Sequence, residues 1–107
     1  MAHRLAPAAA ADLDEIWSYL VEQSSDVDVA RRFVAAITAR FYLLAAHPEY
    51  LLAAHPELGR ARNEFGTGIR SHAVGNYIIF YRIENDEVLI QRVLHGRRDL
   101  GPLLRDR

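Results

Sequence analysis

The sequence predicts an α+β fold, in which a short strand and a helical hairpin precede a three-stranded antiparallel sheet. Three observations lead to this prediction. The first half of the chain repeats apolar residues at helical spacing, in two stretches separated by a short polar break. After Gly59 the pattern changes to short segments rich in β-branched and aromatic residues, divided by turn residues. The chain has 107 residues, which is enough for one domain around a single core.

The N-terminal elements are a strand and a helix. We expect an edge strand at His3–Leu5. Pro7 suits the first turn of the following helix, because the missing N–H of proline costs nothing there. The helix is predicted at residues 8–23, where apolar side chains recur at i, i+3, i+4 and i+7. These side chains form one stripe: Leu13, Ile16, Trp17 and Leu20.

A second helix is predicted at residues 26–46. Residues 23–25 break the first pattern, and Ser25 followed by Asp28 resembles a capping box. A second apolar stripe comes next: Ala30, Phe33, Val34, Ile37, Phe41 and Leu44. Two amphipathic helices joined by so short a break are expected to form an antiparallel hairpin.

The second half predicts three strands, at Ile69–Val74, Tyr77–Ile83 and Val88–His95. The pair Gly75-Asn76 fits a two-residue type II′ hairpin turn with glycine first. Residues 84–87 supply the second turn. The expected order is therefore β-α-α-β-β-β, ending in an antiparallel meander.

These turns set a register that pairs residue 74 with 77 and 83 with 88, and strict alternation then sorts the strand residues onto two faces. The bulkier face is expected against the helices: Arg70, His72, Val74, Tyr77, Ile79, Tyr81, Ile83, Val88, Ile90, Arg92 and Leu94. The other face receives Ile69, Ser71, Ala73, Ile78, Phe80, Arg82, Leu89, Gln91, Val93 and His95. Because one helical hairpin cannot cover both faces, the second face is expected to be an interaction surface.

An exact tandem repeat interrupts the chain: YLLAAHPE at residues 42–49 is repeated at 50–57. Pro48 forbids a continuous helix through both copies without a kink, because proline removes a backbone hydrogen bond. We therefore expect the second helix to stop near His47 and a separate helical turn to run from Pro48 to about Ala54.

Composition limits the function classes. The chain has no cysteine, which excludes disulfides and a thiol nucleophile, and it has no apolar stretch of the length that a membrane span needs. The alanine run at residues 8–11 does not have the pattern of a signal peptide, so a cytoplasmic protein is expected. Residues 1–57 hold four Arg and eight acids, whereas residues 58–107 hold nine Arg and six acids. The basic second half permits an acidic or nucleic-acid-associated partner.

Residues 58–100 carry a resemblance to a known family. The pieces are HPELGR at 55–60, GIRSHAVGNYIIFYR at 68–82 and RVLHGRRDL at 92–100, and APAAAADLDEIWSYL at 6–20 agrees with them. Together they resemble the ParE branch of the ParE/RelE toxins of bacterial toxin–antitoxin pairs. The resemblance implies a single toxin domain over residues 1–107. It also implies one helix-to-sheet junction, so the repeat at 42–57 is interpreted as a duplication of that junction.

The resemblance implies one of two activities. RelE-like members are ribosome-dependent ribonucleases that cut messenger RNA, whereas ParE-like members poison DNA gyrase without chemistry of their own. At the basic and tyrosine positions of the ribonucleases this chain has Ile69, Ser71, Ile78 and about Leu103, and only Arg97 matches. The implied function is therefore gyrase inhibition, neutralised by a ParD-like antitoxin. This function requires no cofactor, metal, membrane or direct nucleic-acid binding.

The alternatives are a ribonuclease that uses His95 and Arg97, and an inert toxin damaged by the duplication. The candidate target-binding residues are His95, Arg97 and Arg98. The candidate antitoxin-binding residues are apolar: Ile78, Phe80, Leu89, Val93, Leu103 and Leu104. Arg70 and Arg92 lie on the expected helix face, where an unpaired charge is costly. They are expected to form structural ion pairs with acids of the first helix: Asp12, Asp14 and Glu15.

Overall fold

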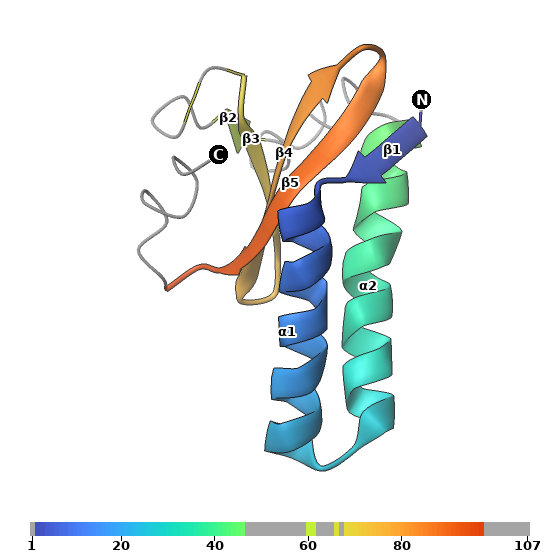
Figure 1. The fold of residues 1–107 in the computed structure, drawn as a ribbon, viewed down its shortest axis with the longest axis vertical. Helices are drawn as coiled ribbons and strands as arrows, with labels where there is room; N and C mark the ends of the chain where they lie inside the picture. The colour runs from blue at the N-terminus through green and yellow to red at the C-terminus, as the bar shows by residue number, and fades with distance from the viewer. Residues whose placement is uncertain (1, 47–59, 62–65, 67, 98–107) are drawn as a thin grey trace.

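The computed structural model describes residues 2–46, 60–61, 66 and 68–97, and it shows a helical hairpin packed against a mixed sheet (Figure 1). The elements in chain order are β1 (Ala2–Leu5), α1 (Pro7–Ser24), α2 (Val27–Ala46), β2 (Arg60–Ala61), β3 (Arg70–Val74), β4 (Tyr77–Glu84) and β5 (Glu87–His95). The predicted α+β fold and its order of elements are confirmed, with the two-residue β2 in addition. The predicted helical turn from Pro48 lies outside the described residues.

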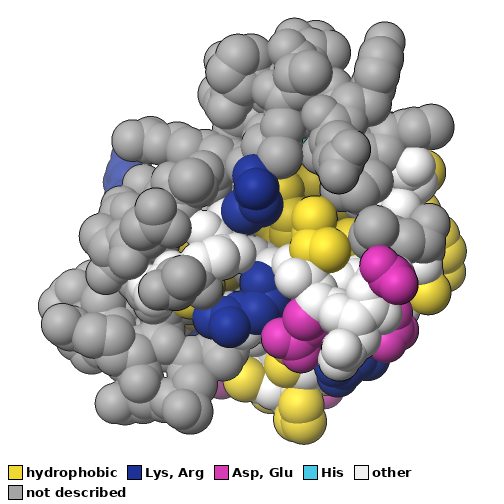
Figure 2. Space-filling model, turned by 90° about the horizontal axis from the view of Figure 1, so that it is seen from above, with side chains coloured by type: hydrophobic (Ala, Val, Ile, Leu, Met, Phe, Trp, Pro, Cys, Tyr) yellow, Lys and Arg dark blue, Asp and Glu magenta, His cyan; other side chains and the backbone are white. Residues whose placement is uncertain are grey.

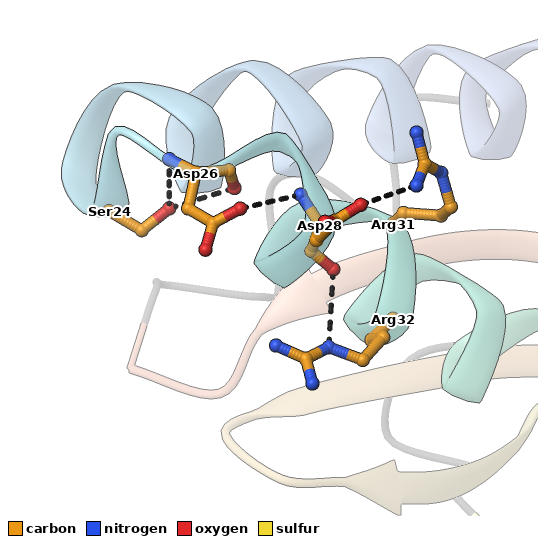
Figure 3. Close-up of polar contacts among 5 residues, drawn as sticks. All are labelled: Ser24, Asp26, Asp28, Arg31 and Arg32. Carbon is orange, nitrogen blue, oxygen red and sulfur yellow. Dashed lines mark hydrogen bonds and ion pairs between the residues drawn. The ribbon is translucent and has the colours of Figure 1, made fainter.

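The turn between the helices differs in detail from the predicted capping box. Ser25 has a left-handed backbone (φ 55°) and its N–H donates to the Val21 carbonyl at 2.8 Å, so it ends α1. The Asp26 carboxylate accepts the N–H of Asp28 at 2.9 Å and therefore caps α2 (Figure 3). Ser25 cannot cap α2, because its backbone is used to reverse the direction of the chain.

The sheet has the strand order β1-β5-β4-β3-β2, in which β1 runs parallel to β5 and the other neighbours are antiparallel. The predicted pairs 74 with 77 and 83 with 88 are both present. Gly75 has a φ of 58°, as the first position of a type II′ turn requires. Asn85 and Asp86 both have positive φ (52° and 58°), which is the type I′ pattern.

A β-bulge interrupts the pairing of β4 with β5. Tyr81 pairs with Ile90, but the preceding residue Phe80 pairs with Arg92, so Gln91 is an extra residue on β5. The faces of β5 therefore exchange after Ile90. Consequently Val93 lies on the helix side of the sheet and Leu94 on the opposite side. The strict alternation expected from the sequence was wrong for both residues.

Two apolar clusters occupy the two faces of the sheet. The larger lies under the helices, and its buried members are Ala9, Ile16, Ile37, Phe41, Leu44, Ala45, Val74, Ile79, Tyr81, Val88, Ile90 and Val93. The smaller cluster on the other face contains Ile69, Phe80 and Leu94, with Ile78 half-buried beside them. Phe80 is completely buried, so the apolar surface expected there is not exposed at its centre. Neither described helix combines the length and the apolar character that crossing a membrane requires.

Candidate functional site

A groove of about 400 Å³ opens beside the end of β5, between α1 and the sheet. Its walls come from three elements that are far apart in the sequence. The lining residues are Asp12, Glu15, Ile16 and Tyr19 from α1, Tyr77 from β4, and Val93 and His95 from β5. The groove therefore combines aromatic rings with carboxylates at the strand end where the sequence placed the active surface.

The bulge is the reason that His95 faces this groove. With strict alternation from Ile90, His95 would lie on the face away from the helices, as the sequence predicted. Instead His95 pairs with Tyr77, and their ring centroids are 5.2 Å apart at an interplanar angle of 80°. Tyr77 in turn contacts Phe33 of α2, with centroids 5.5 Å apart. Edge-to-face contacts of this kind hold the rings in defined orientations.

Asp12 fixes the bulge from α1. Its carboxylate accepts two hydrogen bonds at 2.8 Å from Arg92, through Nε and Nη2, and a third at 2.9 Å from the N–H of Val93. Asp12 is 5% exposed, so removal of its partner would leave a buried charge. Hydrogen bonding to Asp12 raises the pKa of Arg92, against the opposing effect of burial. The expected ion pair of Arg92 is thus made with Asp12.

The other residues of the expected ion pairs have different surroundings. Glu15 lines the groove and acts on Arg92 through its charge. Asp14 is exposed on α1. Arg70 is half-buried on β3 and pairs across the sheet with Tyr81. Burial raises the pKa of Tyr81 to about 12, and the positive charge of Arg70 acts in the opposite direction.

The backbone after β5 continues along the β3–β4 turn. The Gly96 N–H donates to the Asn76 carbonyl at 2.8 Å, and the Arg97 N–H donates to His95 Nδ1 at 3.2 Å. Because Nδ1 accepts a hydrogen bond, the neutral ring of His95 carries its proton on Nε2. Arg97 is exposed. Arg98, Leu103 and Leu104 lie outside the described residues.

The strand positions that would have to be basic in a ribonuclease are occupied by buried or half-buried side chains. Ile69 is 2% exposed and Ser71 is 6% exposed, and Ile78 packs beside the smaller cluster. Across the part of the chain that the structure describes, no three His, Asp or Glu side chains gather as metal ligands. The groups present at the end of β5 can therefore hold a partner by charge and stacking.

At the opposite end of the sheet, acidic and basic side chains neutralise one another. Arg4 of β1 lies 3.4 Å from Glu84 and 3.6 Å from Glu87, which flank the β4–β5 turn. Figure 2 shows this end from above, with basic side chains beside acidic and hydrophobic ones. The side chains of all three residues are more than a third exposed, so the ion pairs contribute little to stability.

Sequence reasoning did not assign Tyr19 or Tyr77 to a site. Tyr77 was placed in the core, and Tyr19 lies off the apolar stripe of α1. One signal was present: Tyr19 follows Glu15 by four residues, so the two side chains are neighbours on the helix surface. Tyr19 is 54% exposed, which is high for so large a side chain next to a groove.

Comparison with known proteins gives a consistent result. The family model described as the ParE toxin of the type II toxin–antitoxin system parDE matches residues 4–51 and 50–100. Toxin ParE1 of Caulobacter vibrioides is 36% identical over 93 residues, covering 87% of this chain and 86% of the relative. Toxin ParE1 of Mycobacterium tuberculosis is 33% identical over 97 residues, covering 90% of each chain.

Solved structures share the fold. A chain of the chromosomal ParDE toxin–antitoxin system from P. aeruginosa superposes with a TM-score of 0.69 at 23% identity, covering 89% of this chain and 95% of that one. A chain of the RelBE2 toxin–antitoxin complex from Mycobacterium tuberculosis superposes with a TM-score of 0.59 at 23% identity, covering 88% and 95%. The family model and the two relatives define the class of the protein as a toxin of a type II toxin–antitoxin system. Within that class, the chain belongs to the ParE toxin family.

Proposed function

We propose that this toxin inhibits DNA gyrase by binding, without a chemical step of its own, and that a cognate ParD-like antitoxin neutralises it. Membership of the ParE family supports the proposal. The observation that carries it is that Ile69, Ser71 and Ile78 occupy strand positions that are basic in the ribonucleases, so these positions offer no charged group to a scissile phosphate.

Cleavage of RNA needs a base for the attacking hydroxyl, a cation for the phosphate and an acid for the leaving group. Among the residues that the structure describes, His95 is the only imidazole at the end of β5, and its Nδ1 accepts the Arg97 N–H. A neutral ring with its proton on Nε2 is a donor there and not a base. Ile69 and Ser71 add no cation, because neither side chain carries charge. The uncharged side chains of Ile69 and Ser71 favour a poison over a ribonuclease.

The proposed target-binding surface is the segment His95, Arg97 and Arg98. Arginine presents its donors as a planar fork that matches carboxylate and phosphate groups. Arg97 is exposed, and its side chain forms no hydrogen bond or ion pair with another described residue, so it is available to such groups. Because gyrase acts on DNA in the cytoplasm, the proposal also places the protein there.

The test uses purified gyrase, supercoiled plasmid and ATP, with linear cleaved DNA as the readout. We expect the parent protein to raise the linear fraction, and the double variant Arg97→Ala, Arg98→Ala to lose at least about ten-fold in potency, which corresponds to about 1.4 kcal/mol of binding. The control is Arg31→Ala, Arg32→Ala, which removes the same charge from adjacent exposed positions on α2.

The outcomes separate the candidate functions. Full poisoning by the Arg97, Arg98 double variant would place the active surface elsewhere. A parent protein that leaves gyrase unaffected but cuts messenger RNA in a translation extract would establish the ribonuclease instead, and His95→Ala should then abolish cleavage. A folded parent protein with neither activity would indicate an inert toxin.

A further inference from the structure

We propose that the groove between α1 and the end of β5 is a recognition site for an arginine side chain of the antitoxin. This inference rests on the proposed function, because it names the group by which the neutralising partner would hold the toxin. Of the residues that line this groove, the proposed gyrase contact uses only His95, so the inference assigns a ligand class to the remaining lining.

The aromatic lining is the first reason. Tyr19, Tyr77 and His95 come from three different elements and meet at one groove. Tyrosine rings attract a cation placed over their faces, and the planar guanidinium of arginine also stacks on them. Tyr77 is held between Phe33 and His95, so its ring is oriented before any partner arrives. Tyr19 is 54% exposed and can be covered by an incoming side chain.

The charge of the groove is the second reason. Two carboxylates line it, but the negative charge of Asp12 is matched by Arg92 through two hydrogen bonds. Glu15 is exposed and forms no ion pair with a described residue at hydrogen-bond distance. Glu15 therefore supplies the net negative charge at the groove, one helical turn before Tyr19. A carboxylate next to tyrosine rings suits a cation that can form an ion pair with the carboxylate and also stack on the rings.

The charge of α1 as a whole assigns the groove to the antitoxin. This helix carries four acids and no basic residue: Asp12, Asp14, Glu15 and Glu22. A partner that covers α1 must therefore be basic where it touches the helix. The proposed gyrase contact has the opposite charge, since the segment beyond His95 is rich in arginine and therefore positive. Basic groups of the antitoxin would thus bind the acidic surface of α1. Acidic groups of the target would bind the adjacent basic segment beyond His95.

The direct test is a titration of the ¹⁵N-labelled protein with two capped alanine peptides, one with a central arginine and one with a central citrulline, followed by amide chemical shifts. Citrulline has the shape of arginine without its charge. We expect the arginine peptide to shift the amides of Glu15, Tyr19, Tyr77 and His95, and to bind at least about five-fold more tightly than the citrulline peptide. The peptide assay contains neither gyrase nor antitoxin, so its result is independent of the proposed function.

Two variants and one control locate the interaction. Glu15→Gln and Tyr19→Leu should each weaken binding of the arginine peptide at least about three-fold while the remaining amide spectrum stays dispersed. The control Asp14→Asn removes the same charge as Glu15→Gln from the neighbouring exposed position on α1 and should keep the affinity of the parent.

Four outcomes would overturn the inference. They are equal binding of the arginine and citrulline peptides, shifts that map outside the groove, full binding by Glu15→Gln, and no binding by the folded parent protein. Loss of gyrase poisoning by Glu15→Gln would reassign the groove to the target and would overturn its assignment to the antitoxin. If gyrase is unaffected by the parent protein but the arginine peptide binds as expected, the proposed gyrase target fails and the arginine site stands.

Discussion

Asp12 is the residue that joins the two layers of the molecule at the site. Its carboxylate accepts hydrogen bonds from the Arg92 side chain and from the Val93 backbone. The same group therefore neutralises the charge of Arg92 and provides a partner for the N–H of Val93 beside the bulge. Breaking a buried ion pair by removing one partner costs more than the pair contributes, because the remaining charge stays buried. Single-residue changes at Asp12 should therefore affect both stability and the position of His95.

We predict that Asp12→Asn lowers the free energy of unfolding by about 3 kcal/mol, because the Arg92 side chain, which is 16% exposed, loses its hydrogen-bonded counter-ion, whereas its charge interaction with Glu15 remains. Urea unfolding followed by circular dichroism measures the change. Asp14→Asn is the control, since Asp14 is exposed on the same helix and should cost less than about 0.5 kcal/mol. Similar losses for the two variants would contradict a structural role for the Asp12 clamp.

His72 is a second buried polar residue with an unusual setting. It is completely buried on β3, and Arg40 of α2 lies 3.3 Å from its Nε2, while its Nδ1 has no hydrogen-bond partner among the described residues. Burial, together with the charge of Arg40, lowers the pKa of His72 from 6.5 to about 4. The folded protein therefore keeps this histidine neutral, whereas the unfolded chain protonates it readily below pH 6.5.

This difference predicts a loss of stability in mild acid. The contribution of His72 is fully present above pH 6.5 and declines as the pH falls toward about 4, because only the unfolded chain takes up the proton in that range. The shift corresponds to at most about 3 kcal/mol. Urea unfolding of the parent and His72→Gln at several pH values between 4 and 7 measures it. A variant with the same pH dependence as the parent would show that another group is responsible.

At the scale of elements, the sequence predicted most of the fold because its signals are local. The apolar stripes placed both helices, and Gly75 and the acidic turn at residues 84–87 set the register of the strands correctly where they begin. The bulge was missed, because residues 88–90 and 93–94 are all apolar and either phase of alternation buries apolar side chains on both faces. The tertiary contact with Asp12, which is distant in sequence, decides between the phases. The groove could not be predicted for the same reason.

Phe80 shows the energetic consequence of the second cluster. It is completely buried with Ile69 and Leu94 on the face of the sheet away from the helices. We predict that Phe80→Ala lowers the free energy of unfolding by about 4 kcal/mol, since the loss of a buried aromatic ring leaves a cavity. Thermal and urea unfolding measure this, with Ile83→Ala as the control at a side chain that is 37% exposed.

If the antitoxin binds the face of the sheet away from the helices through Phe80, the Phe80→Ala variant should behave differently. If Phe80→Ala left stability unchanged and weakened only the complex with the antitoxin, Phe80 would belong to an interface and not to the core. Ile78 and Leu89 are half-buried, and their contact with an antitoxin stays a prediction.

At the scale of the whole molecule, the tandem repeat is the feature that divides the family match. The family match falls in two segments, residues 4–51 and 50–100, which meet inside the repeat. The described part of the first copy, residues 42–46, forms the last turn of α2, where Leu44 and Ala45 are buried. A match that restarts at the second copy supports an inserted duplicate between otherwise continuous halves.

We predict that deleting residues 50–57 leaves a folded and active toxin, because the joined sequence YLLAAHPELGR keeps one complete junction. Shortening the connection between α2 and β2 reduces the entropy cost of closing it, and the expected gain is less than about 1 kcal/mol. The melting temperature and the gyrase cleavage assay test this. Unfolding of the deletion variant would show that the second copy has become part of the core.

The extra residue at Gln91 has a consequence for how relatives with this fold can diverge. The bulge divides β5 into two parts whose side chains alternate out of phase with each other. Loss of a single codon at this point would rotate the end of the strand by half a turn, turning Leu94 toward the helices and His95 toward the other face. A change in length can thus exchange one recognition surface for another without any substitution. In this fold, partner choice can be inherited through the spacing of residues as well as through their identity.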